Sequence, residues 1–201
     1  ARSSRSMWPI AADLRKAGYR VHNLDYPTRP YGVEGLVQRF VAPAIEACDR
    51  RQPIHLVTHS LGGILVRFYL QSAKLPEGSR IVMLAPPNQG SEVADFVRSW
   101  APYRLFMGRV GQQLGTGPDG IARRLGPIAA EVGVIAANRS LQPWFLPLLP
   151  GENDGAVSVA STRLPEMRDF IVVATNHTLV MLHPRVRRQV IHFLANGRFQ
   201  S

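Results

Sequence analysis

Apolar residues along the chain form two kinds of pattern. Short unbroken apolar runs bounded by polar or turn-forming residues predict buried strands; they occupy 53–57, 80–84, 133–137 and 169–173. Around them, apolar residues recur at helical spacing over 7–17, 33–50, 64–70 and 184–194. Alternation of buried strands with helices favours an α/β fold, a mostly parallel central sheet flanked by helices on both faces.

Three stretches have a less regular pattern. Residues 19–24 alternate apolar and polar positions, which predicts one more strand. Pro43 interrupts the pattern of 33–50, which predicts a kink or a break there. Gly and Pro punctuate 101–127, and we expect that stretch to be an excursion over the sheet. With no repeat or linker, residues 1–201 are most simply one domain.

The sequence Thr-His-Ser-Leu-Gly-Gly occupies 58–63, where a predicted strand meets a predicted helix. A sharp strand-to-helix turn raises a serine hydroxyl above the edge of a sheet, so Ser60 is a candidate nucleophile. Gly62 supplies the small residue that such a turn needs, whereas Thr58 replaces the usual first glycine. The alternative is an ordinary turn in which Ser60 caps the helix.

A nucleophilic serine needs an acid and a histidine later in the chain. Asp154 follows the 133–137 strand and precedes a glycine, which indicates either a tight turn or the carboxylate that orients a base. Glu152 is the second candidate acid. His177 lies in the loop after the last predicted strand and is the candidate general base, with His183 as its rival.

The remaining histidines have weaker claims. His55 lies in the strand before the turn and is expected to be a core group. His59 is adjacent to Ser60, so the two side chains should diverge; it could shape the site but is a poor base. His22 and His192 fall in elements that should face elsewhere.

The 58–63 turn resembles the nucleophile elbow of the α/β-hydrolase superfamily, lipase and esterase branch. Together with segments 86–91, 111–115, 151–159 and 176–179, it makes the whole chain similar to small bacterial lipase- or esterase-like hydrolases. The resemblance implies a triad of Ser60, Asp154 and His177 in that chain order, and the backbone N–H of Leu61 as one oxyanion donor. It implies acyl transfer to water with no metal or organic cofactor.

The same resemblance implies a second oxyanion donor on a His-Gly loop that follows a strand beside the elbow strand. That loop is not in this sequence, where Ala1 is the residue nearest to its end. We therefore expect an N-terminal strand to be missing, with about 10 to 40 further residues before Ala1. Asn88 is a further candidate contact with substrate, and a structural turn is its alternative role.

These features predict a serine hydrolase that cleaves carboxylic esters through an acyl-enzyme. An amidase or thioesterase could use the same triad, and a hydrolase-fold protein that only binds its ligand is a further alternative. Residues 101–127 and 144–146 could form an acyl pocket or simply cover the sheet.

Composition narrows the possible partners. The 24 Lys and Arg against 14 Asp and Glu give a formal charge of +10, mostly from scattered arginines. This charge is either a set of solvated faces or an attraction to anionic lipid headgroups or an acidic substrate. No nucleic-acid-binding motif occurs. The single cysteine, Cys48, excludes an intrachain disulfide, and no apolar run reaches the ~18 residues of a membrane span.

Overall fold

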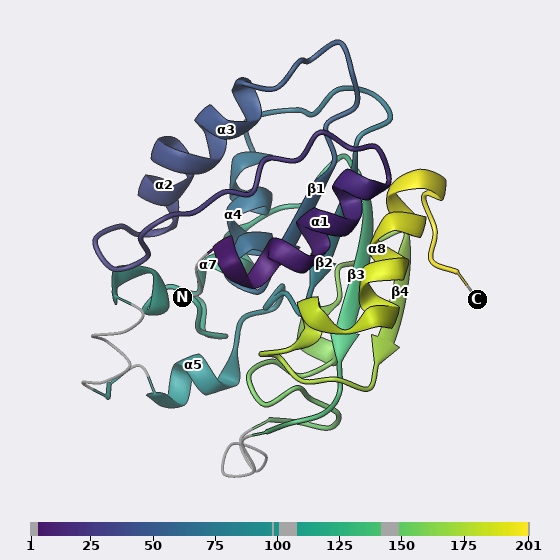
Figure 1. Cartoon of the computed structure of the whole chain (residues 1–201). Helices are drawn as coiled ribbons and strands as arrows, with labels where there is room; N and C mark the ends of the chain where they lie inside the picture. The colour runs from purple at the N-terminus through teal and green to yellow at the C-terminus, as the bar shows by residue number, and fades with distance from the viewer. Residues whose placement is uncertain (1–3, 98, 101–107, 142–148, 201) are drawn as a thin grey trace.

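Four parallel strands form one sheet in the order of the sequence (Figure 1). The computed structural model describes residues 4–97, 99–100, 108–141 and 149–200. The strands are β1 Leu56–His59, β2 Arg80–Leu84, β3 Glu131–Ala137 and β4 Asp169–Val173. In register, Leu56 lies opposite Ile81, and Ile81 lies opposite Val132. The α/β fold is therefore confirmed, and a strand lies at each of the four predicted places. β2 and β3 are buried, whereas β1 begins three residues later than predicted, and β1 and β4 are mostly half-buried.

Helices cover both faces of this sheet because the strands are apolar on both sides. Val82 and Leu84 face α1 (Trp8–Lys16) and α8 (Pro184–Asn196), the two helices in front of the sheet in Figure 1. Ile81 and Met83 point to the other face, where they pack with Val66 of α4 (Leu61–Tyr69). Successive residues of one strand thus serve two separate cores, as the period of two requires.

The predicted strand at 19–24 is wrong. In the described part of the chain these residues have no strand conformation and no backbone hydrogen bond to β1, which pairs only with β2. The segment is attached through side chains: the Tyr19 ring packs edge-on against His55, with 5.7 Å between ring centres. The alternating pattern predicted the alternating partial burial of 19–24 correctly, but a strand also needs a partner for its backbone groups.

The long helical pattern at 33–50 becomes three consecutive pieces. They are α2 (Val33–Leu36), a π-helical turn η2 (Val37–Val41) and α3 (Ala42–Glu46). Pro43 is the second residue of α3, which continues directly from η2, so its missing N–H removes one hydrogen bond from a continuous helical segment. The expected interruption therefore takes the form of a widened π turn before the proline, and the helix ends at Glu46 rather than Arg50.

Short helices follow the carboxyl ends of the strands. They are α5 (Glu92–Val97), α7 (Ile121–Arg124), η4 (Ala160–Thr162) and η5 (Val180–Leu182), while η1 (Ser4–Met7) precedes α1. Residues 110–122 pack mainly on α2 and α4, so this part of the 101–127 excursion covers helices more than the sheet. Residues 101–107 and 144–146, for which we predicted a pocket or a cover, lie outside the described residues. No helix of the described chain is long and apolar enough to cross a membrane.

We predict that Gly133→Ala destabilises the fold by about 1–3 kcal/mol, the usual effect of overpacking a core. A Cβ at this position in β3 would lie 2.6 Å from Cε2 of Phe193 and 2.8 Å from Cζ of Phe199. Urea unfolding of the variant measures the loss. Gly117→Ala is the matched control, since a Cβ there would meet nothing within 4 Å. Equal stability of the two variants would contradict this description of the core.

Candidate active site

Ser60 occupies the turn between β1 and α4 in a strained backbone conformation. Its φ of 52° and ψ of −120° lie in a region that residues other than glycine rarely adopt. The amide of Ser60 donates to the carbonyl of Leu84 in the neighbouring strand at 2.9 Å, and its carbonyl accepts from the amide of Gly63 at 3.0 Å. The strain is thereby held between the sheet and the first turn of α4, at the carboxyl edge of the sheet.

Two glycines give this turn the space that it needs. A Cβ on Gly63 would lie 3.0 Å from Cβ of Pro86, and one on Gly62 would lie 3.3 Å from Cβ of Thr58. The second distance explains how a threonine replaces the usual first glycine of the motif. Gly62 leaves the room that the Thr58 side chain occupies.

The structure brings Asp154 and His177 to Ser60. Nδ1 of His177 lies 2.7 Å from Oδ2 of Asp154, and Nε2 of His177 lies 3.0 Å from Oγ of Ser60. Asp154 is 2% exposed, and its Oδ1 accepts hydrogen bonds from the amides of Ala156 (3.0 Å) and Val157 (2.8 Å). The amide of His177 also donates to the Asp154 carbonyl at 3.2 Å.

This arrangement places a base within reach of a hydroxyl and a carboxylate behind the base. The three groups come from three segments: the turn after β1, the loop between β3 and β4, and the loop after β4. Parallel strands end at the same edge of a sheet, so the fold alone brings these segments together.

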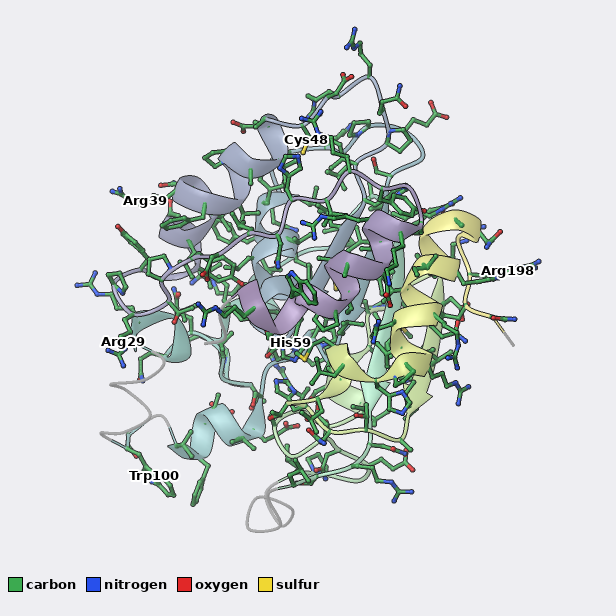
Figure 2. All side chains as sticks on the ribbon, in the orientation of Figure 1. Arg29, Arg39, Cys48, His59, Trp100 and Arg198 are labelled. Atoms are coloured by element: carbon green, nitrogen blue, oxygen red, sulfur yellow. The ribbon has the colours of Figure 1, made fainter. Side chains whose placement is uncertain are left out.

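His59 also contacts His177, through the backbone carbonyl of His177. Its Nε2 is 3.0 Å from the carbonyl oxygen of His177, and the two rings are 5.0 Å apart between centres. A carbonyl can only accept, so Nε2 of His59 donates this hydrogen bond. His59, which is labelled in Figure 2, is half-buried. Leu61 is the first residue of α4, where backbone N–H groups lack an intrahelical acceptor, and Ala1 lies outside the described residues.

Asn88 has a structural environment. Its side chain is fully buried, and its Nδ2 donates to the carbonyl of Thr162 at 2.8 Å. Its backbone carbonyl accepts from Nη1 of Arg67 at 2.8 Å. Of the two roles that the sequence left open, these contacts favour the structural turn.

Arg67 is a residue that the sequence analysis missed. Although charged, it is 4% exposed, and its Nη2 donates to the carbonyls of Leu125 (3.2 Å) and Ala122 (3.4 Å). Burial lowers the pKa of its guanidinium, and the nearby charge of Glu166 opposes that shift. Arg67 therefore joins α4 to α7 and, through Asn88, to the loop after β2. The sequence feature that could have revealed it is an arginine inside the otherwise apolar helical run of 64–70.

The competing acid and histidines lie elsewhere. Glu152 is exposed, unlike the buried Asp154. Nδ1 of His55 accepts from the amide of Arg80 at 3.0 Å, and burial, with the charge of Arg80 second, lowers the pKa of His55. His192 of α8 contacts, through Nδ1, the carbonyl of Arg198 beyond the end of that helix, at 2.8 Å. His183 is the residue that precedes α8, with its Nδ1 buried.

A parallel sheet flanked by helices, with a serine on a strained strand-to-helix turn, defines an α/β hydrolase. The family model described as "Alpha/beta hydrolase family" matches residues 1–194, and the chain belongs to this family. A search of curated protein sequences gave no significant match.

Solved structures similar to this chain share its fold at low sequence identity. Lipase BlEst2 of Bacillus licheniformis in its mature form has a TM-score of 0.76 and 20% identity, covering 98% of this chain and 87% of its own. Phospholipase PlaB of Legionella pneumophila has a TM-score of 0.71 and 16% identity, covering 98% and 58%. The metagenomic carboxyl esterase MGS0156 has a TM-score of 0.68 and 18% identity, and the match covers 87% of this chain and 59% of the esterase chain. The chain thus spans less than two thirds of the last two proteins.

We predict that the free energy of unfolding falls as pH rises from about 10 to about 12, because of Tyr26. Its hydroxyl lies 3.8 Å from the position of a Cβ on Gly62, and burial, with Asp25 second, raises the pKa of Tyr26 from 10.0 to about 12. In this interval the native state holds a proton that the unfolded state has lost, so its stability decreases with pH.

Denaturant unfolding across this pH range measures the effect, and tyrosinate absorbance reports the titration itself. Tyr26→Phe is the comparison, since the phenylalanine keeps the ring without the ionisable group. If the wild type and Tyr26→Phe lose stability equally between these pH values, the environment assigned to Tyr26 is wrong.

Proposed function

We propose that the protein is a serine hydrolase that cleaves carboxylic esters. The observation that supports this most strongly is the chain of contacts from Oγ of Ser60 to Nε2 of His177 (3.0 Å) and from Nδ1 of His177 to Oδ2 of Asp154 (2.7 Å). A weak hydroxyl nucleophile becomes competent when a neighbouring base takes its proton.

In the proposed reaction, Oγ of Ser60 attacks the ester carbonyl carbon while Nε2 of His177 accepts the hydroxyl proton. The carbon–oxygen bond to the alcohol breaks, and the alcohol leaves with the proton from His177. Water then attacks the acyl-enzyme, giving its proton to His177, and the carboxylic acid leaves as Ser60 recovers its proton.

Asp154 orients the base in this scheme. The amides of Ala156 and Val157 occupy its Oδ1, so Oδ2 is directed at Nδ1 of His177. That contact favours the proton on Nδ1 and leaves Nε2 as the acceptor facing Ser60.

The N-terminus of α4 would stabilise the oxyanion. Leu61 directly follows the nucleophile, and its N–H belongs to the first turn of a nine-residue helix. Helix N-termini favour negative charge through their unpaired N–H groups and dipole, and one such donor contributes roughly 10²–10³ in rate.

Ester hydrolysis is favoured over amide or thioester hydrolysis by the similar structures, which are those of a lipase, a phospholipase and a carboxyl esterase. Matched ester, thioester and amide substrates with one acyl group separate the three reactions. A protein that only binds its ligand is the less favoured alternative, because it would have no need of a complete triad.

We predict that Ser60→Ala lowers the hydrolysis of p-nitrophenyl esters by about 10⁴-fold or more, as expected when a triad nucleophile is removed. Esters of short and long acyl chains should be compared. A fluorophosphonate should label the wild type at Ser60, and mass spectrometry of the labelled peptide identifies the site. Ser72→Ala is a control serine, because Ser72 is exposed in the turn after α4. Full activity in Ser60→Ala would refute the proposed nucleophile.

We further predict a positioning role for His59. The hydrogen bond to the His177 carbonyl links the loop of the base to the strand that ends at the nucleophile. His59→Phe keeps a ring but loses the donor, so kcat on the same esters should fall roughly ten- to hundred-fold with little change in KM. His59→Gln retains a donor and should recover much of the activity. Equal losses in both variants would argue against this hydrogen bond as the cause.

A further inference from the structure

Large apolar side chains that are exposed to solvent are concentrated around the carboxyl edge of the sheet. In the described residues, six of them lie in segments that follow β2, β3 or β4 or that contact those segments; we call them the apolar rim. The rim consists of Trp8, Phe96, Trp100, Leu141, Leu179 and Leu182. The seventh exposed large apolar side chain, Leu24, lies two residues before Tyr26, which approaches the start of α4.

Part of the rim lies close to the candidate active site. Leu179 and Leu182 follow His177 closely, and the turn η5 that contains Leu182 contacts both η1 and α1, where Trp8 is 64% exposed. Phe96 and Trp100 pack edge to face at the end of α5, with 5.4 Å between ring centres. Figure 2 shows Trp100 projecting outward, and in Figure 1 α5 lies on the side toward which the arrowheads of β3 and β4 point.

The opposite edge of the sheet has a different surface. Segments 49–53, 71–79, 126–130 and 163–168 lead into the four strands, and among these described residues no large apolar side chain is exposed. Charged side chains such as Arg50, Arg51, Lys74 and Glu77 are exposed there instead. The apolar exposure is therefore a property of one edge and not of the surface in general, which marks an interaction site.

Exposed arginines accompany the rim. Arg5 lies in η1, Arg185 is three residues after Leu182, and the amide of Arg139 donates to the carbonyl of Thr175 beside the His177 loop. None of the three forms an ion pair within the described part of the chain. The exposed carboxylate in the described loops after β3 and β4 is Glu152, so positive charge predominates around these loops.

We propose that this edge docks on an anionic lipid surface, with the apolar rim in the headgroup region and the arginines on the phosphates. Tryptophan is favoured at the boundary between lipid and water, and a cation near an anionic membrane adds attraction. A second copy of this chain fits less well, because it would bring the same arginines and a formal charge of +10 to the interface.

This inference rests on the proposed function, because the use of docking would be to present lipid esters directly to Ser60. Binding itself does not need hydrolysis. The two proposals can therefore be tested separately, with binding measured on Ser60→Ala and hydrolysis measured on a short soluble ester.

The experiment is flotation of Ser60→Ala protein with vesicles of phosphatidylcholine alone or mixed with phosphatidylglycerol. We expect binding to the mixed vesicles that weakens with added salt. In the same background, Trp8→Ser should weaken binding about ten-fold through lost apolar contact, whereas Trp8→Phe should retain most of it. Arg185→Ser should weaken binding about five-fold.

Arg20→Ser is the matched charge control, since Arg20 is exposed next to Tyr19, which packs against His55 before β1 begins. It should bind as the parent does. The Trp8 and Arg185 variants in a wild-type Ser60 background should keep full activity on p-nitrophenyl acetate.

Two results would overturn the docking surface: no binding to mixed vesicles, or equal losses for Arg185→Ser and Arg20→Ser together with no effect of Trp8→Ser. Either result leaves the hydrolysis of soluble esters intact. Loss of the proposed function would show differently, as vesicle binding with ester hydrolysis that does not depend on Ser60.

Discussion

The strained backbone of Ser60 is the constraint on which the rest of the site depends. Its positive φ is tolerated because the Ser60 amide is bound to Leu84 of the next strand and its carbonyl to Gly63 of α4. That geometry favours glycine at 62 and 63, where a Cβ would lie 3.3 Å from Cβ of Thr58 and 3.0 Å from Cβ of Pro86. The sheet, the helix and the turn are therefore mutually dependent, and the serine hydroxyl is presented by a rigid support.

Strain recurs at the end of the neighbouring strand. Ala85 has a φ of 45° and donates its amide to the carbonyl of Ile135, as Ser60 does to Leu84. Buried Arg67 stabilises the loop that follows by donating a hydrogen bond to the carbonyl of Asn88. A buried guanidinium costs free energy unless its donors are paired. Backbone carbonyls accept from Nη1 and Nη2 of Arg67, whereas its Nε has no hydrogen-bond partner among the described residues. The support of the site thus extends from α4 across the loop after β2.

The acid and the histidine depend on a second set of contacts. Asp154 is held by the amides of Ala156 and Val157, and the amide of His177 donates to the Asp154 carbonyl. His59 adds a link from β1 to the carbonyl of His177. Two loops that differ in sequence position are thereby tied to each other and to the strand of Ser60. A side chain on either loop alone would not keep a distance of about 3 Å to the hydroxyl.

The sequence by itself determined the places of the four strands, the closing helix and the chain order of Ser60, Asp154 and His177, because apolar runs and turn-forming residues are local features of the sequence. It was wrong about a strand at 19–24, which has no hydrogen-bonding partner in the described chain, and it missed Arg67. Only the tertiary structure decided which histidine faces the hydroxyl, that the Asn88 side chain is buried and hydrogen-bonded, and that apolar exposure is concentrated at one edge. Each of these depends on residues distant in sequence meeting in space, and a local pattern carries no information about such partners.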